Sequence, residues 1–149
     1  MDFELLLFSI KTQEEYGYFL KGILEKNLKV DFTFKHSEDD ISLCFQCMTI
    51  SLDLEEIFGL DVIEEDFNFK ANLSARIQVF SKFYSDALDI IFRVIKEITM
   101  KSDCNLLLLG NGSNVIIKKD NGKFYSSELK DYYYFEFPFE ILEADIARS

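Results

Sequence analysis

Hydrophobic and polar residues alternate along several stretches of the chain, and this pattern predicts β-strands. The longest alternation covers residues 67–79, where seven apolar side chains fall on one face and six polar ones on the other. Shorter alternations at residues 30–35 and 41–45 predict a hairpin, and apolar runs at residues 3–10 and 105–109 predict two buried strands. Together these strands predict a sheet that is covered on one face and wet on the other.

Two segments have the spacing of amphipathic helices. Thr12 and Glu15 fit a capping box, and the helix they predict continues to about residue 27. A second helix of about 18 residues is predicted after the long alternating strand. The apolar positions of these two helices recur at intervals of three and four residues, and they are Tyr16, Phe19, Leu20, Ile23 and Leu24 in the first and Tyr84, Ala87, Leu88, Ile91, Val94, Ile95 and Ile98 in the second.

Glycine and asparagine mark the turns near the C-terminal end. Gly110-Asn111-Gly112 and Asn121-Gly122 predict two tight turns, so residues 105–127 are expected to form a meander. The stretch YYYFEFPFEIL at residues 132–142 predicts either a last strand or an extended arm over the core, and Pro138 excludes a central strand. The whole pattern predicts one α+β domain over residues 1–149, with a single layer of largely antiparallel sheet and two main helices on one face.

Composition and charge limit the classes of function. An apolar fraction of 48% predicts a folded chain despite its net charge of −11. No apolar run reaches the roughly 20 residues that cross a bilayer, and the N-terminal sequence lacks a basic leader, so we expect a cytoplasmic protein without membrane contact. Three cysteines cannot all pair with one another, which fits a reducing compartment. The acidic balance argues against direct nucleic-acid binding and favours a basic protein partner.

The negative charge is concentrated in one segment. Residues 38–66 contain ten acids and no lysine or arginine, so this segment carries ten of the eleven surplus negative charges. The ten acids, which we call the acidic segment residues, are Glu38, Asp39, Asp40, Asp53, Glu55, Glu56, Asp61, Glu64, Glu65 and Asp66.

Part of this charge has a purely structural interpretation. Asp53 to Glu56 can begin a short helix that turns Phe58 inward and ends at Gly59, and acids in a first helical turn are favoured by the helix dipole. This interpretation accounts for only three of the ten acids, and it does not explain the missing bases. Two hypotheses remain for the rest: a solvated surface, or a dedicated surface that binds a basic partner.

Other patterns suggest chemistry but have simpler structural explanations. Cys44 and Cys47 have the C-x-x-C spacing of zinc and redox sites, and Cys104 and His36 could complete four ligands. On a straight strand, however, the two thiols point to opposite faces, and no glycine favours a turn between them. We therefore expect free thiols and no metal site.

The remaining candidates also favour a protein that is not an enzyme. His36 lies in a polar link and is expected to be a surface histidine. The sequence Gly110-Asn111-Gly112-Ser113 lacks the spacing of a phosphate-binding loop and is followed by a strand. The paired acids Glu55-Glu56 and Glu64-Glu65-Asp66 have neither an evident nucleophile nor the spacing of a calcium loop. No cofactor is expected.

The block DALDIIFRVIKEITMKSDCNLLLLGNGSNVIIKKDNGKFYSS resembles the C-terminal half of a bacterial immunity-protein family associated with swarming-inhibition toxins. The features that carry this resemblance are a strand near an arginine, a helix, an aspartate before an apolar strand, and two asparagine–glycine turns. In this chain they are Arg76, the helix through Ile98, Asp103, residues 106–109, Asn111-Gly112, residues 115–119 and Asn121-Gly122. The opening strand and helix are also similar to the start of that family.

The resemblance implies a cytoplasmic immunity protein that binds and neutralises a cognate toxin, and the acidic segment residues are the candidate contact surface. The alternative is an acidic adaptor or regulatory domain that binds a basic host protein unrelated to toxins. Tyr132 to Tyr134 are a second candidate contact, because aromatic anchors are common at interfaces.

Overall fold

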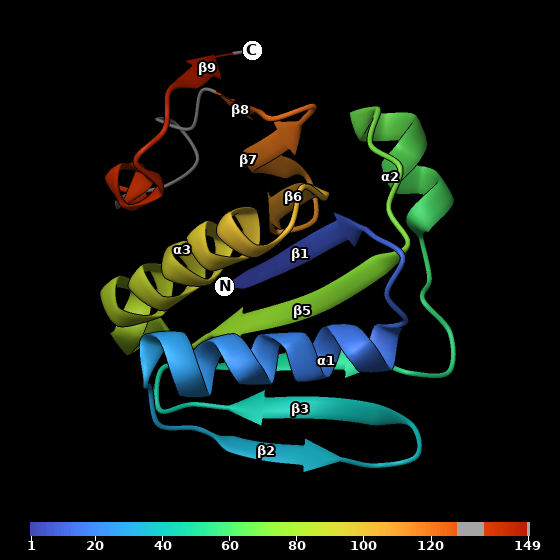
Figure 1. Cartoon of the computed structure of the whole chain (residues 1–149), viewed down its shortest axis with the longest axis vertical. Coiled ribbons are helices and arrows are strands. Elements are labelled where there is room, and N and C mark those ends of the chain that lie inside the picture. Colours follow the sequence, from blue (N-terminus) through green and yellow to red (C-terminus); the bar gives the residue numbers. More distant parts are fainter. Residues whose placement is uncertain (128–135, 149) are drawn as a thin grey trace.

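The chain folds around one continuous β-sheet (Figure 1). The computed structural model describes residues 1–127 and 136–148. Within them it is a mixed α/β structure with three α-helices and a nine-stranded sheet of order β2-β3-β4-β5-β1-β6-β7-β8-β9. Every neighbouring pair is antiparallel except β8 and β9. The strands are β1 Asp2–Phe8, β2 Thr33–His36, β3 Asp40–Cys44, β4 Met48–Asp53, β5 Leu73–Val79, β6 Asn105–Gly110, β7 Asn114–Asp120, β8 Lys123–Ser126 and β9 Ile146–Arg148.

The larger core lies on the face of the sheet that α1 (Gln13–Gly22) and α3 (Tyr84–Lys101) cover. Every second residue of the strands points into it, for example Leu5 and Leu7 of β1. The helix α1 begins with the predicted capping box, in which the Glu15 amide donates to Thr12 and the Glu15 carboxylate accepts from the Thr12 amide. It continues as one π-helical segment, Ile23–Leu28, so the helical region reaches the predicted end near residue 27.

A smaller core lies on the opposite face, under α2 (Leu60–Phe67). Ile63 of α2 packs there with Leu6 of β1 and with Leu107 and Leu109 of β6. Lys118 of β7 donates from Nζ to the Phe67 and Asn68 carbonyl oxygens, at 3.1 and 3.3 Å, and so satisfies carbonyls at the C-terminus of α2. The predicted layer of two helices on one face was therefore incomplete, because a third helix covers part of the other face.

The prediction for residues 67–79 was wrong in its first half. The strand β5 begins only at Leu73, while Phe67 ends α2 and Phe69 is buried in the smaller core. The alternating pattern continues through residues 67–71 because every second side chain there also contacts apolar groups, and such contact does not require a strand. The central position of this strand is confirmed, since β5 pairs with β1 and β4.

The segment before α2 also differs from its prediction. Residues 48–53 form β4, which the sequence interpretation missed, and no helix spans residues 53–58. Gly59, expected to end a helix, instead precedes α2 as its N-cap with φ +79°. Glycine is found more often just after the end of a helix than at its N-cap, but it occurs at both positions, so the residue type alone did not fix the direction.

The remaining strand and turn predictions are confirmed within the described residues. The strands β2 and β3 form the predicted hairpin, and β6, β7 and β8 form the predicted meander. Asn111, Gly112, Asn121 and Gly122 all have positive φ. Phe137 and Phe139 pack against Phe92 of α3, so the part of the C-terminal stretch after residue 135 lies as an arm over the core. Tyr132 to Tyr134 lie outside the described residues.

Candidate functional site

The β2–β3 turn and the end of β4 bring the first acids together. Asp40 at the start of β3 is the register partner of Asp53 at the end of β4. The Leu54 amide donates to the Asp39 carbonyl at 2.9 Å, which holds the two loops side by side. Ser37 Oγ donates to Asp40 Oδ1 at 2.7 Å and so fixes one carboxylate of the turn. Acids that are 13 residues apart in sequence thus share one end of the sheet.

Two of these carboxyl groups interact directly. A side-chain hydrogen bond with Asp39, together with repulsion between the two negative charges, raises the pKa of Glu55 above its usual value. A hydrogen bond between two carboxyl groups requires one of them to carry a proton. Glu55 therefore takes up a proton at a higher pH than an isolated exposed carboxyl group does.

Asp53 is the one acidic segment residue with an ion pair among the described residues. Arg76 of β5 places Nη2 3.0 Å from Asp53 Oδ2 and 3.1 Å from Oδ1. The Arg76 side chain remains 61% exposed, so this pair sits in solvent. The sequence interpretation placed Arg76 on the polar face of a strand and in the family pattern, but it did not connect Arg76 with Asp53. The pairing of β4 with β5 brings these two side chains together.

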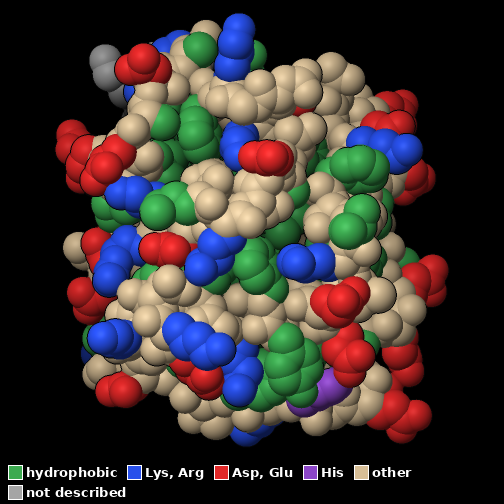
Figure 2. Space-filling model, in the orientation of Figure 1, with side chains coloured by type: hydrophobic (Ala, Val, Ile, Leu, Met, Phe, Trp, Pro, Cys, Tyr) green, Lys and Arg blue, Asp and Glu red, His purple; other side chains and the backbone are tan. Residues whose placement is uncertain are grey.

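The acids on α2 form a second group on the same side of the molecule. Asp61, Glu64, Glu65 and Asp66 are exposed on this helix. Figure 2 shows acidic side chains along the right margin, over the region where Figure 1 places the β2–β3 turn, the end of β4 and α2. Nine of the ten acidic segment residues have no ion pair within residues 1–127 and 136–148, since only Asp53 of the ten has one. The fold thus leaves this charge uncompensated.

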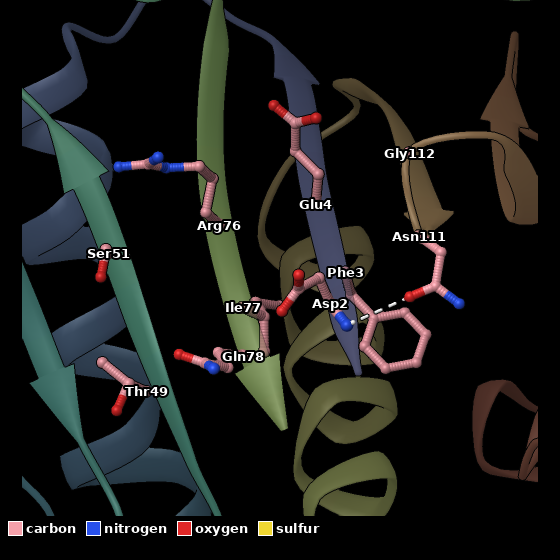
Figure 3. A pocket seen from close by; sticks show the side chains of 10 residues that line it. All are labelled: Asp2, Phe3, Glu4, Thr49, Ser51, Arg76, Ile77, Gln78, Asn111 and Gly112. Carbon is pink, nitrogen blue, oxygen red and sulfur yellow. Dashed lines mark hydrogen bonds between the residues drawn. The ribbon is translucent and has the colours of Figure 1, made fainter. Parts of the chain in front are cut away.

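A polar groove of about 550 Å³ adjoins the first group on the open face of the sheet (Figure 3). Thr49 and Ser51 of β4, Arg76 and Gln78 of β5, and Asp2 and Glu4 of β1 contribute its polar side chains. Asn111 Oδ1 accepts from the Asp2 amide at 3.3 Å and closes one end. Arg76 extends from β5 towards β4 in the close view and, through Asp53, joins the groove to the acidic end. The groove offers donors and acceptors with two carboxylates and one guanidinium.

His36 was predicted to be a surface histidine in a polar loop, but it belongs to a strand and contacts two side chains of α1. It is the last residue of β2, and its Nδ1 lies 2.8 Å from the Tyr18 hydroxyl while its Nε2 lies 3.1 Å from Glu14 Oε1. Both partners belong to α1, so the imidazole ties the edge strand to that helix. The structure brings a phenol to His36 where a nucleophilic triad would need serine or cysteine.

The cysteines do not form a ligand set. The chain turns between β3 and β4, so the expectation of a straight strand across Cys44 and Cys47 was wrong. Burial raises the pKa of the Cys47 thiol, which disfavours the thiolate that binds metals. Among residues 1–127 and 136–148 there is no group of three or more His, Cys, Asp or Glu side chains placed to hold an ion. The absence of zinc from purified protein stays a prediction, which elemental analysis can check.

Comparisons of the chain with models of protein families, with curated proteins and with solved structures found no match. In the part of the chain that the structure describes, no helix has both the length and the apolar character needed to cross a bilayer.

Proposed function

We propose that this protein is a cytoplasmic immunity protein, which binds a basic bacterial toxin through its acidic end and thereby neutralises it. The observation that carries the proposal is the uncompensated charge: nine of the ten acidic segment residues lack an ion pair within the described residues. A solvated surface normally mixes both signs, because like charges repel and destabilise the compact state. A partner that carries the missing positive charge would relieve this repulsion.

The family resemblance is the reason for proposing a toxin as the partner. The acidic end of this protein is the reason for proposing that the toxin has a basic surface. A field summed over many acids raises the association rate of a basic partner, and the effect weakens as salt screens it. Immunity requires rapid capture of a toxin that reaches the cell, and electrostatic steering provides this speed. An acidic adaptor would use the same field for another basic protein, so electrostatics alone does not distinguish the two functions.

The decisive experiment tests protection. Cells would express the toxin encoded beside this gene, together with the wild type or with a variant in which Glu55, Glu56, Glu64 and Glu65 are all changed to Lys. These four side chains are exposed, so the variant should fold, which circular dichroism can verify. We expect the variant to lose protection and to associate with the purified toxin about 10-fold more slowly, or worse, at low salt.

A matched control carries the same change in charge elsewhere. Asp31, Asp103, Glu140 and Asp145 are exposed and lie outside the acidic segment, and changing all four to Lys should leave protection largely intact. If the first variant protects cells as well as the control does, the acidic end is not the contact surface. If no toxin gene lies beside this one, the adaptor function becomes the better explanation.

A further inference from the structure

The acidic end also carries apolar side chains that the core does not use. Phe58 is 76% exposed and Val62 is 51% exposed. Phe58 lies in the loop before α2, and Val62 is an exposed residue of that helix, next in sequence to the buried Ile63. In Figure 2 hydrophobic and acidic side chains lie side by side over the region of α2.

The fold keeps Phe58 out of the core in a specific way. It occupies the position before the N-cap of α2, where a hydrophobic residue often packs onto the first turn of the helix, but here the side chain is exposed instead. Gly59 follows with φ +79°, a conformation that turns the chain sharply at this point. Phe58 is thus an exposed residue at the junction between the loop that carries Glu55 and Glu56 and the helix that carries Asp61, Glu64 and Glu65.

We infer that Phe58 and Val62 are the apolar anchors of the acidic surface, and that its partner is a basic protein segment with apolar side chains among its lysines or arginines. This inference rests on the proposed function, since it describes the partner of the same surface. A few buried anchors supply most of the affinity at an interface, whereas surrounding charges mainly set the association rate. The acids would thus capture the partner and the two anchors would hold it.

Charge complementarity selects this occupant over two others. A second copy of the chain would bring its own net charge of −11 to the same surface, and the two copies would repel. An anionic lipid surface would be repelled for the same reason. A partner of purely basic, polar composition would satisfy the acids but leave Phe58 exposed to water.

The test uses two synthetic helical peptides with identical lysine positions, one with leucine and the other with alanine at the remaining positions of one face. Fluorescence anisotropy would measure their binding to the full chain at low and at physiological salt. We expect the wild type to bind the leucine peptide about tenfold more tightly than the alanine peptide. Changing both Phe58 and Val62 to Ser should reduce this ratio to about one, while the salt dependence remains.

Met100 provides the matched control. It is 69% exposed on α3, away from the acidic segment, and Met100→Ser should leave the leucine preference unchanged. Two outcomes would disprove the role of Phe58 and Val62 without contradicting the role of the acids. They are a preference for the leucine peptide that persists in the Phe58→Ser/Val62→Ser variant, and equal binding of both peptides to the wild type. Binding of neither peptide, or binding without salt dependence, would overturn the acidic surface itself and the anchors with it. The toxin experiment then remains a separate test of immunity.

Discussion

The hydrogen bond between Asp39 and Glu55 shows how the charge acts at the scale of single residues. The two side chains come from different loops, and their interaction raises the pKa of Glu55 above its usual value. The folded state therefore holds this proton more tightly than the unfolded state does. As the pH falls through the raised pKa, protonation relieves the repulsion and favours folding, whereas above it the paired negative charges oppose folding.

Replacing Glu55 by Gln should therefore stabilise the protein at neutral pH. The amide can donate to Asp39 without a titrating proton, and it removes one of the two repelling charges. We expect the Tm to rise at pH 7 and the gain to shrink as the pH falls through the raised pKa of Glu55, where the wild-type carboxyl takes up its proton. Thermal unfolding followed by circular dichroism across this pH range would measure the effect.

Glu56→Gln is the control for this prediction. It removes the same charge one residue along the same exposed loop, and it should give a smaller gain because the bond to Asp39 remains. Equal gains in the two variants, or a Glu55→Gln gain that does not change with pH, would argue against the shared proton.

The packing of α1 shows what decides structure at the scale of elements. Gly17 faces the sheet, where a β-carbon would lie 2.6 Å from Ile41 Cδ1 and 3.2 Å from its Cγ2. The helix can approach β3 this closely only because Gly17 has no side chain. Tyr16 beside it is buried, and its hydroxyl donates to the Leu5 carbonyl at 3.1 Å, so the helix is held at this depth.

Gly17→Ala should destabilise the protein although alanine favours helices. Overpacking in a core typically costs about 1–3 kcal/mol, which exceeds the gain of about 1 kcal/mol from helix propensity. The added methyl meets Ile41, which is fully buried and has little room to move. Urea denaturation should show a lower free energy of unfolding with an unchanged m-value.

Ile41→Val supplies the matched test, because it removes the atom that a β-carbon at Gly17 would meet first. Alone it should cost about 0.5–1.5 kcal/mol. The double variant Gly17→Ala/Ile41→Val should be more stable than the sum of the two single effects predicts. Strict additivity would show that α1 does not depend on close approach at this position.

At the scale of the whole molecule, the net charge of −11 opposes the compact state. Salt should therefore stabilise the wild type, since screening weakens repulsion between exposed charges. The variant with Glu55, Glu56, Glu64 and Glu65 changed to Lys has a net charge of −11 + 8 = −3. Its Tm should rise less than that of the wild type between low salt and about 0.5 M sodium chloride, as calorimetry can measure.

The location of the charge matters as well as its sum. The control with Asp31, Asp103, Glu140 and Asp145 changed to Lys also has a net charge of −3, but it leaves the acids at the end of the sheet in place. We expect its Tm to remain more sensitive to salt than that of the first variant. If the Tm of both variants depended equally on salt, repulsion among the acidic segment residues would not destabilise the fold more than charge elsewhere does.

Local patterns by themselves determined much of the architecture. The capping box at Thr12, the two asparagine–glycine turns and the helical stripe of α3 were predicted correctly because each depends on residues close in sequence. The order of the other strands and helices followed from these elements, but β4, α2 and β9 were not predicted. The concentration of acids in residues 38–66 is likewise a property of the sequence alone.

Only the tertiary structure decided how those acids are arranged and what accompanies them. The pairing of β4 with β5 brings Arg76 to Asp53, and the adjacent loops bring Glu55 to Asp39. Phe58 was expected to face inward, yet it lies exposed before α2, because Gly59 begins that helix instead of ending one. The periodicity of a sequence shows which residues share a face of an element. It does not show what that face packs against, because the packing partner comes from segments distant in sequence.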